Sequence, residues 1–89
     1  MARLEMDGAT MAPMAGSRPD GEHLFDLGVL YATGRDVEQD LVAAHKWFNL
    51  AALKGRKDAI AMRGEIAAQM SESEIAKAQR EARAWISAH

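Results

Sequence analysis

Apolar residues recur three and four positions apart through most of this chain, which is the spacing of one face of an α-helix. The first run of this kind consists of Leu24, Leu27, Gly28 and Tyr31. The second run consists of Leu41, Ala44, Trp47, Phe48, Ala51 and Ala52. Strong strand runs are missing, and alanine, the best helix former, is frequent. The pattern therefore predicts an all-α fold.

Residues typical of helix N-termini precede these two runs, and residues typical of helix C-termini follow them. Asp20 and Asp40 are good N-caps, because a short carboxylate accepts hydrogen bonds from the free amides of a first helical turn. Gly34 and Gly55 follow the two runs, and glycine is the usual residue just past a helix end. We therefore expect one helix from about Asp20 to Gly34 and a second from about Asp40 to Gly55.

The second half of the chain predicts two further helices. The third should begin near Asp58, and the fourth has the clearest start, because Ser71 and Glu74 fit a capping box. In that arrangement each of the two side chains binds the backbone amide of the other residue. The expected apolar face of the third helix is Ala59, Met62, Ile66, Gln69 and Met70. That of the fourth is Ile75, Ala78, Gln79, Ala82, Trp85 and Ile86.

The second and fourth expected helices share a short pattern, a small residue one turn before a tryptophan. Ala44 precedes Trp47 in this way, and Ala82 precedes Trp85. The two helices start about 30–35 residues apart, which is the spacing of helical-hairpin repeats. The pattern therefore predicts two similar helix pairs, stacked as in a solenoid.

A longer set of spaced positions lies between residues 24 and 55. The set consists of Leu27, Gly28, Leu30, Tyr31, Gly34, Val37, Asp40, Ala44, Trp47, Ala51, Ala52 and Gly55. It resembles the Sel-one-like repeat, a family related to tetratricopeptide repeats, and covers about one full repeat or roughly two fifths of the chain. The resemblance implies α/α hairpins that stack into a curved, right-handed solenoid.

The chain departs from that family pattern in two places. The family usually has a second glycine two residues after Gly34, where this chain has Asp36, a residue that tolerates turn conformations. In the second pair, Arg63 and Gly64 displace the usual Leu-Gly and no tyrosine follows, as in a degenerate terminal repeat that caps a solenoid. The expected fold is a short α/α solenoid of two antiparallel helix hairpins over residues 20–89.

Residues 1–19 differ from the rest of the chain, and we expect an irregular tail there. They contain both prolines and four of the six methionines. One interpretation is a disordered terminus, and the other is a docking segment in which Met6, Met11 and Met14 fill grooves on a partner or on a second copy. Charges interrupt any apolar run of secretory-signal length, so we expect a cytoplasmic protein.

Composition narrows the possible functions. The chain has no cysteine, which excludes a disulfide scaffold, a thiol nucleophile and any cysteine-built metal site. It has 13 acidic and 11 basic residues, and a net charge of −2 makes binding to nucleic acid unexpected. Charges are scattered along the sequence, so we predict no membrane span.

No pattern of catalytic or ligand-binding residues stands out. The three histidines, His23, His45 and His89, have no spacing that brings several metal ligands together. No paired carboxylates occupy apolar positions, where acid–base chemistry would favour them. We therefore predict a protein that is not an enzyme, with no catalytic residue, no metal and no cofactor.

A short basic segment follows the second helix and has two interpretations. Lys54, Arg56 and Lys57 lie where cations stabilise the carboxyl end of a helix dipole. Alternatively, Arg56 and Lys57 contact an acidic or phosphate-bearing partner, which would make binding strongly salt-dependent.

The first two helices carry more apolar side chains than one helix–helix seam can cover. We expect no helical unit before the first helix, so part of this face lacks a neighbour, and an exposed apolar patch on a small protein usually marks an interaction site. The candidate partner-binding residues on this face are Phe25, Val29, Leu30, Leu50 and Leu53. The predicted function is a protein–protein interaction module that binds a protein partner or a second copy. The alternative is an accessory or regulatory subunit of a larger enzyme complex.

Overall fold

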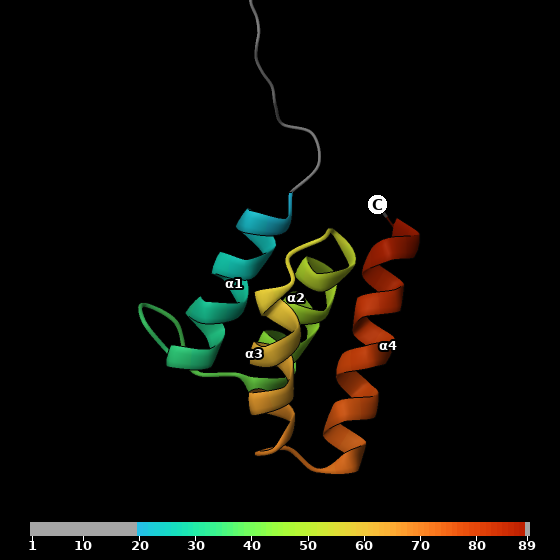
Figure 1. The fold of residues 1–89 in the computed structure, drawn as a ribbon. Helices are drawn as coiled ribbons and strands as arrows, with labels where there is room; N and C mark the ends of the chain where they lie inside the picture. The colour runs from blue at the N-terminus through green and yellow to red at the C-terminus, as the bar shows by residue number, and fades with distance from the viewer. Residues whose placement is uncertain (1–19, 89) are drawn as a thin grey trace, which may run out of the picture.

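A computed structural model describes residues 20–88 as four helices. They are α1 (Gly21–Thr33), α2 (Leu41–Leu53), α3 (Asp58–Ala67) and α4 (Glu72–Ala88), and this part of the chain contains no strand. Figure 1 shows the chain running alternately in opposite directions through the four helices, with short connections between them. The all-α prediction is therefore confirmed for residues 20–88. The predictions for residues 1–19, including those for Met11 and Met14, lie outside the described residues.

The starts of α1 and α2 are those that the two aspartates predict. The Asp20 carboxylate accepts a hydrogen bond from the His23 amide at 2.9 Å. The Asp40 carboxylate accepts one from the Ala43 amide at 3.0 Å. Each aspartate thus satisfies one of the amides that a first helical turn leaves without a partner.

A glycine in the left-handed region follows each of these helices, directly after α1 at Gly34 and two residues after α2 at Gly55. Gly34 has a φ of 72°, and its amide donates to the Leu30 carbonyl at 3.0 Å. Gly55 has a φ of 99°, its amide donates to Ala52, and the Arg56 amide donates back to Ala51. The two bonds made by the Gly55 and Arg56 amides form a Schellman motif, which satisfies the last carbonyls of α2 and turns the chain towards α3.

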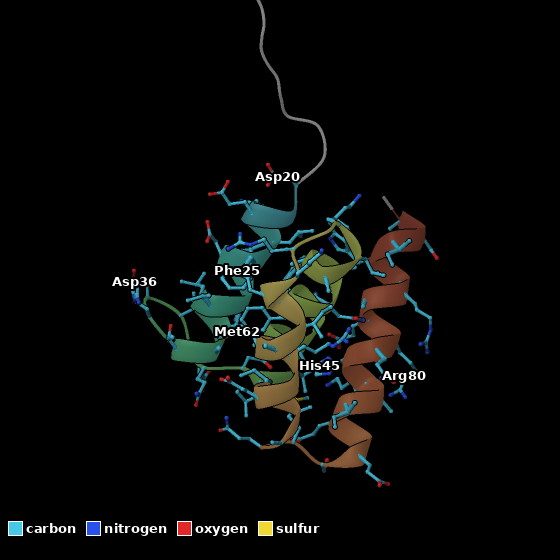
Figure 2. The ribbon with its side chains drawn as sticks, in the orientation of Figure 1. Asp20, Phe25, Asp36, His45, Met62 and Arg80 are labelled. Carbon is cyan, nitrogen blue, oxygen red and sulfur yellow. The ribbon has the colours of Figure 1, made fainter. Side chains whose placement is uncertain are left out.

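The loop between α1 and α2 contains a second left-handed residue. Asp36 has a φ of 66°, a conformation that favours glycine but that aspartate tolerates. The loop is fixed to the end of α1, because the Gln39 side-chain amide donates to the Ala32 carbonyl at 2.8 Å. Figure 2 shows Asp36 at the outer tip of this loop. The chain therefore bends at Asp36 in a conformation that glycine usually adopts.

The connection between α3 and α4 holds the predicted capping box. The Ser71 amide donates to the Glu74 carboxylate at 2.8 Å, and the Glu74 amide donates to the Ser71 hydroxyl at 3.1 Å. The sequence pattern predicts a third helix that extends to about Met70, but α3 ends at Ala67. Gln69 and Met70 instead lie in a tight turn, where their amides bond to carbonyls three residues earlier.

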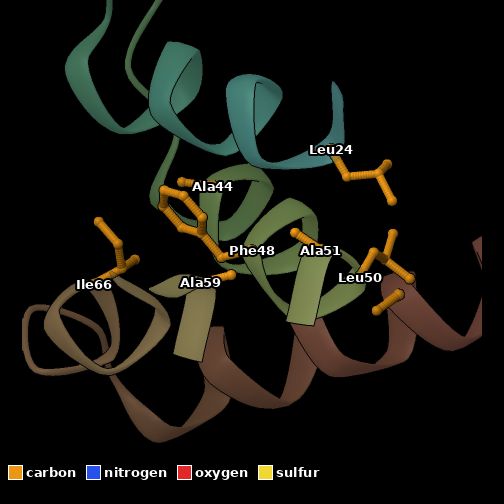
Figure 3. Close-up of a cluster of buried hydrophobic side chains, with 8 residues drawn as sticks. Leu24, Ala44, Phe48, Leu50, Ala51, Ala59 and Ile66 are labelled. Carbon is orange, nitrogen blue, oxygen red and sulfur yellow. The ribbon is translucent and has the colours of Figure 1, made fainter. Parts of the chain in front are cut away.

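Helix α2 is the centre of the described structure, and the main helix–helix contacts all involve it. Phe48 of α2 has no exposed surface, and Figure 3 shows it and Ala44 among the buried side chains next to α1. The core cluster contains residues from all four helices: Leu24, Ala44, Phe48, Leu50, Ala51, Ala59, Ile66 and Ala82. Since α1, α3 and α4 pack on one central helix, each keeps an outer face.

Helices α2 and α4 meet through the repeated alanine–tryptophan pattern. Ala44 and Ala82 are both buried, whereas Trp47 and Trp85 are half-buried. The two indole rings contact each other edge to face, with their centroids 5.8 Å apart. Aromatic pairs favour this geometry because the positive edge of one ring meets the negative face of the other.

Candidate interaction surface

The outer face of α1 holds a small open depression. It has a volume of about 170 Å³, and its lining residues are Asp26, Val29, Leu30 and Arg35. Asp26, Val29 and Leu30 lie on one side of α1, since they are three and four positions apart. Arg35 comes from the loop, directly after the left-handed turn at Gly34. The depression therefore has an apolar centre between an acidic and a basic side chain.

The structure brings together two of the predicted partner-binding residues, Val29 and Leu30. Both are only partly buried and line the same depression, and Val29 also packs against the core cluster. Asp26 and Arg35 were missed as members of this site. Asp26 could have been found from its position one turn before Leu30, but Arg35 joins the site only through the bend of the chain at Gly34.

Phe25 faces α2 rather than the depression. Its ring packs edge on against Phe48, with the centroids 5.4 Å apart. The guanidinium of Arg56 lies 4.1 Å from the centre of the Phe25 ring. Phe25 is thus half-buried between α2 and the connection to α3, where its main contacts are internal.

The structure corrects the prediction for Leu50, which belongs to the core and not to an exposed face. Leu50 is only 2% exposed. Figure 3 shows its side chain and that of Leu24 pointing toward each other, near α4. Leu50 does not belong to the run of apolar residues that predicts the buried face of α2. Its side chain is nevertheless buried, because α2 packs against helices on several sides.

Leu53 is the most exposed large apolar residue of the described chain, at 65%. It occupies the last turn of α2, and this end lies beside the start of α1, where Gly21 approaches Lys54 and Arg56. The depression, in contrast, lies along the second half of α1. Leu53 is therefore not part of the same surface as Val29 and Leu30.

The basic segment after α2 offers fewer free cations than its sequence indicates. Arg56 donates two hydrogen bonds to the Asp58 carboxylate, at 2.8 and 3.1 Å. This hydrogen bond with Asp58 raises the pKa of the Arg56 guanidinium above its ordinary value. Lys57 is exposed, but Arg56 is held by Asp58 and by the Phe25 ring, so the segment makes a weak anion site.

Sequence reasoning also missed the burial of His45. This residue of α2 is only 3% exposed, and its Nδ1 atom has no hydrogen-bond partner. Burial, reinforced by the charge of Arg63, lowers the pKa of the imidazole below its ordinary value. Arg63 itself donates to the Asn49 side-chain oxygen at 2.6 Å. Burial and the charge of Arg63 thus both favour the neutral form of His45.

The described residues show no other site of recognisable chemistry. Within residues 20–88, no three His, Asp or Glu side chains are placed to hold a metal ion. None of the helices described is both long enough and apolar enough to cross a membrane. Figure 2 shows Arg80 pointing away from the other helices, on the outer side of α4.

Comparison with known proteins gives no match. No family model, no curated protein and no solved structure matches this chain.

Proposed function

We propose that this protein is a cytosolic protein–protein interaction module that binds through the outer face of α1. The observation that carries the proposal is the partly exposed pair Val29 and Leu30, at the centre of the depression between Asp26 and Arg35. A preformed helical surface with an apolar centre and a polar rim is the usual anatomy of a protein interface.

We further propose that the four helices form a short solenoid of the Sel-one-like kind, made of two antiparallel hairpins. Three features support this assignment: the buried Gly28, the left-handed bends at Gly34 and Asp36, and the edge-to-face contact of Trp47 with Trp85. Solenoids of this type bind partners along the extended concave surface that their stacked repeats form.

The alternative role is an accessory subunit that stays docked on a larger complex. Both roles use the same face, and they differ in how stable the isolated chain is. A permanently docked subunit should be poorly stable or aggregate alone, whereas a transient module should remain folded and monodisperse.

The proposal is tested by a charge placed at the centre of the depression. The Leu30→Glu variant should lose its bound protein, because binding would bury an unpaired carboxylate. Ile60→Glu is the matched control, since Ile60 is an exposed apolar residue of α3, 53% exposed. Bound protein is measured by pulldown, and helix content by circular dichroism. Binding that survives Leu30→Glu in a folded protein would contradict the proposal.

A further inference from the structure

The charges that flank the α1 depression are arranged so that the face complements itself. Asp26 lies in the middle of α1, and Arg35 lies just beyond its end, with Val29 and Leu30 between them. Both charged side chains are exposed, and neither forms an ion pair within 4 Å in residues 20–88, although the Asp26 charge contributes to the raised pKa of Arg56. A surface of this kind fits a partner that presents a cation opposite Asp26 and an anion opposite Arg35.

A second copy of the same chain presents that pattern when its α1 runs in the opposite direction. A two-fold axis that passes through the depression, between Asp26 and Arg35, brings position 26 of one copy opposite position 35 of the other. Asp26 then meets the partner subunit's Arg35, and Arg35 meets the partner subunit's Asp26. Each favourable contact is formed twice, as in every isologous interface.

We propose that two copies of this chain associate through antiparallel packing of their α1 outer faces. Val29 and Leu30 of each copy lie at the centre and are removed from water, which is the main driving force of association. The two Asp26–Arg35 pairs at the rim fix the direction and register of the helices. One helix face is small beside the roughly 800 Å² per partner of a standard interface, so the dimer is concentration-dependent.

This inference rests on the proposed function, because it names the partner of the same face. Its test uses charge reversal in the full chain, measured by sedimentation equilibrium over a range of concentrations. Asp26→Arg and Arg35→Asp should each weaken self-association at least about tenfold, because each puts like charges opposite each other twice. An equimolar mixture of the two variants should associate again, since an all-basic face then meets an all-acidic one.

Association in the mixture distinguishes loss of a direct contact from damage to the fold. Two misfolded variants would not associate when mixed, whereas two folded variants with complementary charges would. Glu65→Arg, on the exposed side of α3, is the control and should associate like the wild type. A wild-type chain that is monomeric at every concentration would overturn the dimer, as would two variants that fail to associate when mixed. In either case, the proposed function would still be supported if the Leu30→Glu variant lost binding to a protein other than a second copy of this chain.

Discussion

Gly28 of α1 and Phe48 of α2 are in direct contact, with no room between them for a side chain. A Cβ atom on Gly28 would lie 2.6 Å from two carbons of the Phe48 ring. Neither residue can move easily, because Gly28 is buried within α1 and Phe48 has no exposed surface. This close approach sets how α1 lies on α2, and hence which side of α1 faces outward.

The Gly28→Ala variant should therefore be destabilised. A helix normally gains from alanine, but here the added methyl overlaps the ring, and overpacking of this kind costs typically about 1–3 kcal/mol. The free energy of unfolding is measured by urea denaturation followed by circular dichroism. An unchanged or raised free energy would show that α1 and α2 are not so tightly packed.

Gly64 of α3 provides the matched control, with the opposite expected sign. A Cβ atom at this position would meet nothing within 4 Å, and the residue is exposed inside a helix. Gly64→Ala should raise the free energy of unfolding by about 0.5–1 kcal/mol, because alanine has the higher helix propensity. A loss of stability in the same urea experiment would contradict the exposed position of this residue.

His45 should make the fold sensitive to acid. Its pKa is lowered in the folded state by burial and by Arg63, so the unfolded chain takes up the proton first as the pH falls. Above the unfolded pKa of about 6.5, His45 does not reduce the free energy of unfolding. As the pH decreases below this value, the free energy of unfolding decreases by at most about 1.4 kcal/mol per pH unit.

The His45→Leu variant should lose most of this pH dependence between pH 7 and pH 5. The substitution gives up no Nδ1 hydrogen bond, because that atom has no partner. The exposed His23 serves as the control, and His23→Leu should keep the wild-type dependence. Thermal unfolding at several pH values measures both. Equal slopes for wild type and His45→Leu would show that His45 is not responsible.

Ser71 should contribute measurably to stability through the start of α4. Its hydroxyl accepts a hydrogen bond from the Glu74 amide at 3.1 Å, and its replacement by alanine leaves that amide without a partner. Loss of such a cap costs typically about 1 kcal/mol. Ser87→Ala, near the other end of α4, is the control and should change the stability little. Equal urea midpoints for the two variants would contradict the capping role.

Features that depend on neighbouring residues in the sequence were predictable. The caps at Asp20, Asp40 and Ser71 and the stop at Gly34 act within one turn of a helix, so the residue types alone indicate them. The end of α3 was less predictable, because the apolar spacing continues to Met70 although the helix ends earlier. Helix spacing shows a possible face but does not determine where the backbone turns.

Features that depend on packing between helices could not be predicted in the same way. Leu50 and His45 lie off the main stripe of α2, and both are buried because neighbouring helices surround α2 on several sides. Arg35 joins Asp26 at one depression only because the chain bends at Gly34. The apolar centre of the candidate site could thus be predicted from the surplus of apolar residues in the sequence. Its charged rim could be identified only from the fold.

We propose that another protein surface covers the outer face of α1. A direct test places a photo-crosslinking residue at position 30 of one variant and at position 53 of a second variant, each produced in cells. Leu53 is the better exposed of the two but lies outside the depression. We expect an adduct from position 30 alone, with twice the mass of the chain if the partner is a second copy. No adduct at position 30, or equal adducts at both positions, would contradict the claim.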